Sequence, residues 1–131
     1  MPRTEKRVTT KPLIFGLIFF AACTADRGGS IPAADLAGEY ARSSASARKK
    51  YDGKTIVVRG RLEKTPEMPA TAEAEGLAMI EAGERLVVCR FTHASRPAFS
   101  RLAAGRTITV EGVFNGERGT ELTFCKLVSA M

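Results

Sequence analysis

Aromatic and histidine side chains are scarce in this chain of 131 residues. It has no tryptophan, two tyrosines and a single histidine, His93. Few rings can therefore stack on bases or sugars, and His93 has no nucleophile motif nearby, so we expect it in an exposed loop. Paired catalytic carboxylates, a nucleophile elbow and a glycine-rich phosphate loop are also missing. We expect no enzymatic activity, no cofactor and no bound metal.

Cysteine is rare as well, and the first of the three cysteines follows a segment typical of export. Residues 1–11 carry four basic side chains and one acidic side chain, residues 13–22 carry no charge, and Ala21 and Ala22 precede Cys23. The apolar run is too short to cross a bilayer as a helix. The pattern resembles a bacterial lipoprotein signal, which predicts cleavage before Cys23 and acylation there, with palmitate as an expected acyl group.

Two alternatives exist for this segment: an uncleaved anchor helix, or a plain secretory signal that is cut elsewhere within residues 21–25. Thr24 follows the cysteine. An aspartate at that position resembles the inner-membrane retention signal of Gram-negative lipoproteins. Its absence favours an anchor in the outer membrane, with the domain facing the periplasm.

The signal prediction divides the chain into three parts. We expect a signal peptide at 1–22, a flexible tether at 23–31 and one folded domain at 32–131, which is long enough to close one hydrophobic core. Half of the formal charge of +6 lies in residues 1–22. The mature chain is therefore weakly basic, which argues against a large electrostatic footprint for nucleic acid.

The remaining cysteines, Cys89 and Cys125, form an even pair if Cys23 is lipidated. In an oxidising compartment, a disulfide between them is the simplest assignment. A metal site or a reactive thiol is the alternative. It has little support, because His93 is the only histidine and no paired cysteine motif is nearby.

Periodicity predicts an N-terminal helix followed by five strands. Pro32 suits the first helical turn and Asp52-Gly53 a stop; apolar side chains recur between them at Leu36, Tyr40, Ala47 and Tyr51. The period then changes to two, which predicts strands at 54–64, 77–81, 85–91, 106–115 and 120–128, with a short helix at 97–104. This is the element list of an OB-fold. We therefore expect a mainly β, five-stranded OB-fold barrel with an N-terminal helix and a short helix between strands three and four.

Two of the predicted strands share one construction. The sequence Gly-Lys-Thr-Ile-x-Val-x-Gly-x-Leu starting at residue 53 recurs as Gly-Arg-Thr-Ile-x-Val-x-Gly-x-Phe starting at residue 105. Because side chains alternate along a strand, the apolar residues fall on one face together with Gly60 and Gly112. OB topology pairs these two strands, and a glycine in mid-strand suits a tightly coiled or bulged point of a barrel.

The same alternation places the two cysteines. Cys89 shares a face with Val87 and Phe91, and Cys125 shares a face with Thr123 and Leu127. In OB topology the third and fifth strands are neighbours. A disulfide between these cysteines would therefore join strands that are far apart in the sequence.

From about residue 36 to residue 128 the chain resembles the tRNA-anti-like OB-fold family of small bacterial lipoproteins and secreted proteins. The resemblance rests on Tyr51-Asp52-Gly53-Lys54 before Val58-x-Gly60, on Val88-Cys89-Arg90-Phe91, on Leu102-Ala103-Ala104-Gly105-Arg106 before Val110-Glu111-Gly112, and on Leu122-Thr123-Phe124-Cys125-Lys126-Leu127. These motifs are mostly structural, so they imply the fold. The family's function is unknown, and its name describes ancestry of the fold, not contact with tRNA.

OB-folds usually bind ligands across strands two and three and the two flanking loops, which defines the candidate site. The candidate ligand-binding residues are Arg59, Arg61, Arg90, Asn115 and Arg118. A solvated strand face, to which Arg85 would also belong, is the alternative explanation for the outward arginines. The loop at 65–76 has three glutamates and neither an aromatic nor a basic residue, so it would repel phosphates.

These observations predict a non-enzymatic lipoprotein of the cell envelope that binds a protein or another envelope component, including a glycan. The alternative is a module for oligonucleotides or oligosaccharides. The sequence disfavours nucleic acid as a partner. The expected contact with the membrane is the lipid on Cys23.

Overall fold

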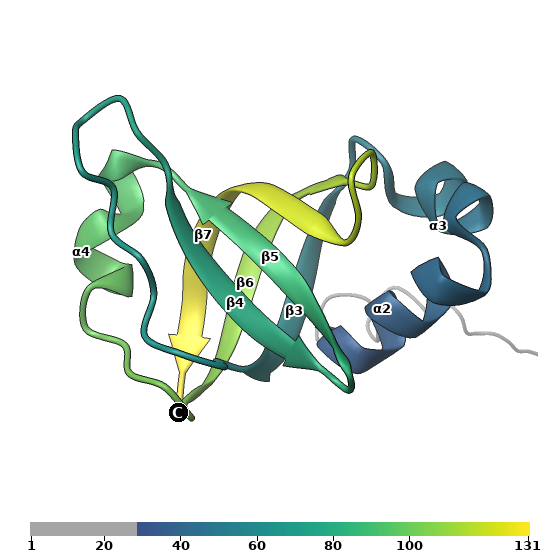
Figure 1. Cartoon of the computed structure of the whole chain (residues 1–131), viewed down its shortest axis with the longest axis horizontal. Coiled ribbons are helices and arrows are strands. Elements are labelled where there is room, and N and C mark those ends of the chain that lie inside the picture. Colours follow the sequence, from purple (N-terminus) through teal and green to yellow (C-terminus); the bar gives the residue numbers. More distant parts are fainter. Residues whose placement is uncertain (1–28) are drawn as a thin grey trace, which may run out of the picture.

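The domain is mainly β, with one mixed sheet of six strands and a few short helices (Figure 1). This computed structural model describes residues 29–131. The strands are β2 (Ile31–Pro32), β3 (Thr55–Arg61), β4 (Gly76–Ala82), β5 (Arg85–Phe91), β6 (Thr107–Asn115) and β7 (Glu121–Ala130). The helices are α2 (Ala33–Arg42), α3 (Ser44–Tyr51), the 3₁₀ turn η1 (His93–Ser95) and α4 (Arg96–Phe99). All five predicted strands are present within a few residues of their predicted ends.

The sheet order is β2-β3-β6-β7-β5-β4, which differs from the predicted closed barrel of five strands. β2 is the additional strand: it pairs with β3 in parallel and includes Ile31 from the predicted tether. The sheet is open because β3 ends at Arg61. Beyond it, the isolated bridge between Leu62 and Ile80 links the chain to β4. Two prolines, Pro66 and Pro69, then interrupt any continued ladder, because proline has no N–H to donate.

Two helices stand where one N-terminal helix was expected. The break is at Ser43, whose φ of −161° is extended, and its hydroxyl accepts a hydrogen bond from the Ser46 amide at 3.2 Å. A serine in this conformation caps a new helix, which the apolar spacing alone does not reveal. Pro32 does not lie in the first helical turn, as predicted, but in β2, at the N-cap position just before α2. Gly53 has a φ of +78°, which agrees with its predicted role in ending the helical segment.

The short helix before β6 starts earlier and is shorter than predicted. The chain forms η1 and α4 over residues 93–99, in place of a helix at 97–104. Phe99 is fully buried, and its ring stacks on Phe91 with 4.2 Å between centroids. The burial of the two stacked phenylalanine rings stabilises this helix, although it is only one turn long. Figure 1 shows α4 at one end of the sheet and the N-terminal helices at the other.

The internal repeat corresponds to two paired strands, as predicted. In the antiparallel ladder of β3 and β6, Gly60 lies opposite Ile108 and Gly112 lies opposite Ile56. A Cβ atom on Gly60 would overlap Ile80 and lie 3.0 Å from the Ala33 Cβ. A Cβ on Gly112 would lie 3.0 Å from both Cys125 Sγ and Leu122 Cβ. Both glycines therefore allow a close approach that a larger residue would block.

One part of the alternation prediction is wrong, because β7 contains a bulge. Its register against β6 shifts between Glu111 and Val113. There two residues of β7, Phe124 and Cys125, lie opposite the single residue Gly112 of β6. The extra residue turns the chain so that Leu122 and Cys125 are both buried, whereas Thr123 is half-buried. Cys125 therefore does not share a face with Thr123. Within residues 29–131, no helix has the length and apolar character needed to cross a bilayer.

Candidate ligand site

Three of the five predicted ligand residues line one pocket. Arg90 comes from β5, Asn115 ends β6, and Arg118 lies in the loop between β6 and β7. The pocket has a volume of about 230 Å³, and its other lining residues are Glu75, Glu121 and Thr123. We call it the polar pocket. It lies at β5, which is the third of the five predicted strands, and at the loop between β6 and β7. OB-folds usually bind their ligands at these two places.

The other two predicted residues, Arg59 and Arg61, do not reach this pocket. Both are exposed on β3, and the sheet order places β6 and β7 between β3 and β5. Their positions agree with the alternative explanation of a solvated strand face. The five residues therefore do not form a single basic surface.

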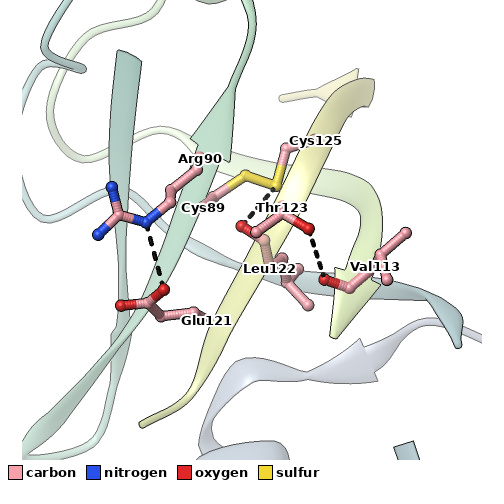
Figure 2. The surroundings of a disulfide bond; sticks show 7 residues. All are labelled: Cys89, Arg90, Val113, Glu121, Leu122, Thr123 and Cys125. Carbon is pink, nitrogen blue, oxygen red and sulfur yellow. Dashed lines mark hydrogen bonds and ion pairs between the residues drawn. A yellow bond between two sulfur atoms is a disulfide. The ribbon is translucent and has the colours of Figure 1, made fainter. Parts of the chain in front are cut away.

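The charge of Arg90 is balanced by two carboxylates. Its Nε donates to Glu121 Oε1 at 3.2 Å (Figure 2), and its Nη1 lies 3.7 Å from Glu75 Oε1. The hydrogen bond to Glu121 is the main cause of a raised pKa of Arg90. Sequence reasoning missed Glu121, because it reaches Arg90 through a parallel pairing of β5 and β7 between distant segments. The pocket thus offers both donors and acceptors.

The loop after β6 is held in place by the N-terminal helices. The Gly116 amide donates to Asp52 Oδ1 at 2.9 Å, and the Tyr40 hydroxyl donates to the Gly116 carbonyl at 2.7 Å. Asp52 also accepts a hydrogen bond from Arg48. The Arg48 bond first, and the Gly116 amide second, hold the pKa of Asp52 below its ordinary value of 3.8. The loop that carries Arg118 is therefore fixed at its start.

A second pocket of about 260 Å³ adjoins the polar pocket. It shares Arg118 and Glu121 with it and is otherwise lined by Ala37, Tyr40, Arg85, Leu86, Val88, Gly119 and Thr120. We call this the hairpin pocket, and the two pockets together the seam groove. Arg85, which was considered only as part of an outer strand face, thus belongs to this groove. The groove follows the line where β5 meets β7.

A disulfide joins β5 to β7 next to the polar pocket. Cys89 and Cys125 are joined, as predicted, with their Cα atoms 6.0 Å apart, and both are buried. In the described part of the chain, β5 and β7 otherwise share two residue pairs, Val88 with Glu121 and Cys89 with Leu122. Figure 2 shows the disulfide between the strands that carry Arg90 and Thr123. Cys23, the predicted lipidation site, lies outside the described residues.

The sequence suggested no catalytic or metal site. His93 is exposed in η1. Across residues 29–131, no three side chains of the His, Cys, Asp and Glu types come together to hold a metal ion. What the seam groove can supply is hydrogen bonding and charge pairing.

Comparisons with known proteins agree on the fold. A lipoprotein from Klebsiella pneumoniae subsp. pneumoniae, described as a candidate nucleic acid-binding protein, has a crystal structure that superposes with a TM-score of 0.67 at 16% sequence identity, covering 86% of this chain and 100% of its own. No curated protein matches the sequence. The family model tRNA_anti-like matches residues 3–126. The chain therefore belongs to the tRNA_anti-like family.

Proposed function

We propose that this chain is a lipid-anchored, non-enzymatic binding protein of the bacterial cell envelope, with its ligand in the seam groove. The observation that carries the proposal is the convergence of Arg90, Asn115 and Arg118 on one pocket at the usual ligand face of an OB-fold. Three separate segments supply these side chains. A purely solvated surface would not need such convergence.

The anchor in this proposal is the acylated Cys23. A basic start, a short apolar run and two alanines before the cysteine support it, and so does the Klebsiella neighbour, which is described as a lipoprotein. Thr24 favours the outer membrane, with the domain in the periplasm. The tether up to β2 would leave the groove free to meet other envelope components.

A protein or another envelope component is the favoured ligand class, because the charges of the polar pocket are balanced. Its lining contains two arginines and two glutamates. Ligands that present both hydrogen-bond donors and acceptors suit such a surface. A strongly anionic polymer would gain less from it.

An oligonucleotide is the second candidate, and two observations favour it. The Klebsiella neighbour is described as a candidate for nucleic acid binding, so the comparisons do not support our expectation that nucleic acid is a disfavoured partner. Moreover, Arg118 is exposed and makes no ion pair with any side chain of residues 29–131. Binding of this class would weaken steeply as salt is added.

Site-specific crosslinking in cells tests the proposed function. A photoreactive amino acid replaces Arg118 in one variant and Arg59 in another, since both arginines are exposed but lie on different surfaces. We expect a discrete envelope adduct from position 118 and little from position 59. Equal adducts from both positions, or none from position 118, would contradict the placement of the ligand.

A further inference from the structure

Phe124 combines backbone strain with exposure. Among residues 29–131 it is the one non-glycine residue with a positive φ, at 54°, and its side chain is 66% exposed. The left-handed region is unfavourable for a bulky residue, and an exposed aromatic ring gains no burial in return. Strain of this kind persists where the surrounding structure imposes it, often at binding sites.

The surroundings of Phe124 impose that conformation. The residue lies in the bulge of β7, and the buried residues Leu122 and Cys125 stand on either side of it along the chain. Cys125 is fixed to β5 by the disulfide, and Gly112 leaves the space that both buried side chains fill. Bulges of this type re-aim one side chain. Here the redirected side chain is an aromatic ring that points into solvent.

The chain places Phe124 next to a residue that lines the seam groove. Phe124 directly follows Thr123, which lines the polar pocket, and it precedes Cys125, whose disulfide partner is the neighbour of Arg90. An exposed, flat apolar side chain therefore belongs to the residue that directly follows one lining residue of the polar pocket. The polar pocket carries a charge-neutral set of planar hydrogen-bonding groups: two guanidinium groups, two carboxylates and one amide.

We propose that the seam groove binds an oligosaccharide and that Phe124 is the platform on which one sugar ring stacks. This inference rests on the proposed function and adds the ligand class. A sugar ring has an apolar C–H face for the phenyl ring, and its hydroxyls both donate and accept hydrogen bonds, as the Arg90–Glu121 pair requires. The two adjoining pockets would hold two or more successive sugars. In the polar pocket, a nucleic acid would instead meet as many carboxylates as guanidinium groups.

The test is a calorimetric titration of the processed lipoprotein in detergent micelles. The probe is a β-1,4-linked N-acetylglucosamine tetramer, and an oligothymidylate is titrated in parallel. We expect the saccharide to bind with an affinity that salt barely changes. Phe124→Ala should weaken binding about tenfold, whereas Val128→Ala, which truncates another exposed apolar residue of β7, should not.

A glycine variant separates binding from folding. Phe124→Gly removes the backbone strain, so its unfolding midpoint in denaturant should not fall, yet its binding should be weakened as in the alanine variant. Undiminished binding by both variants would overturn the role of Phe124. Salt-sensitive binding of the oligothymidylate in place of the saccharide would overturn the ligand class. If neither probe binds while the crosslink from position 118 persists, this inference fails and the proposed function stands.

Discussion

Two joints of the same sheet are built in different ways. The joint between β3 and β6 is a ladder of seven residue pairs, whereas the described joint between β5 and β7 has two pairs and a disulfide. In the first, hydrogen bonds and alternating apolar side chains hold the strands. In the second, the ladder is short, and the disulfide and the Arg90–Glu121 ion pair also connect the strands.

The difference explains where the candidate site lies. A complete ladder leaves little room between its strands, while the diverging strands β5 and β7 leave the seam groove between them. The elements that shape a ligand site are often the less regular ones. The first three of the following changes each weaken one of the two joints.

Loss of the disulfide should have the largest effect on stability. In the chain-entropy model, a loop of this length contributes about 4 kcal/mol to the free energy of unfolding. We expect Cys89→Ala combined with Cys125→Ala to lose a large part of that amount in chemical denaturation. A variant as stable as the wild type would show that the short ladder alone holds β5 to β7.

Valine in place of Gly60 or Gly112 should have the next largest effect. The added side chain would collide with Ile80 in the first case and crowd Cys125 in the second, at a cost of about 1–3 kcal/mol or more. Thr109→Val is the control, because it keeps a β-branched residue on the outward face of β6. Denaturant midpoints of both glycine variants equal to that of the control would contradict the close packing.

Neutralising Glu121 should have a smaller effect. Glu121→Gln weakens the hydrogen bond to Arg90, whose side chain is 28% exposed, and we expect a loss of about 1 kcal/mol. Glu67→Gln is the matched control, because Glu67 pairs with Lys64 and both side chains are more than half exposed. That change should stay within about 0.5 kcal/mol. Equal losses would mean that the Arg90 pair is an ordinary surface pair.

The smallest effect should be a change in how stability depends on pH. Because the folded-state pKa of Asp52 is lowered, its contribution is present above the unfolded pKa and is lost as the pH falls through the folded value. Asp52→Asn should therefore make the decline of stability below about pH 4 shallower. Denaturant midpoints measured from neutral pH to about pH 2 test this. Glu39 also has a lowered pKa, mainly through its bond from Tyr51, so part of the decline should remain.

The sequence predicts the strands well because alternation is a local signal. Ile56, Val58 and Leu62 are buried as the period of two requires. The break between α2 and α3 was not predicted because it depends on a single serine cap. The strand β2 was not predicted because its two residues pair with β3, which is distant in the sequence. The bulge at Phe124 adds one residue to the period, which no local pattern announces. For this reason the exposed ring could not be predicted.

The candidate site was predicted in part for the same reason. The loop after β6 and the third strand follow from the fold, and they supply Arg90, Asn115 and Arg118. Glu75 and Glu121 join them through contacts between distant segments. Their carboxylates change the site from basic to neutral, so its chemistry depended on packing that the sequence does not show.

Native-state hydrogen exchange tests the contrast between the two joints most directly. The amide of Val88 donates to the Thr120 carbonyl in the short joint, and the amides of β3 and β6 lie in the long ladder. On reduction of the disulfide, we expect Val88 to lose protection by local opening while the ladder amides keep theirs. Unchanged protection of Val88, or an equal loss throughout both joints, would contradict the conclusion that the disulfide holds the seam groove together.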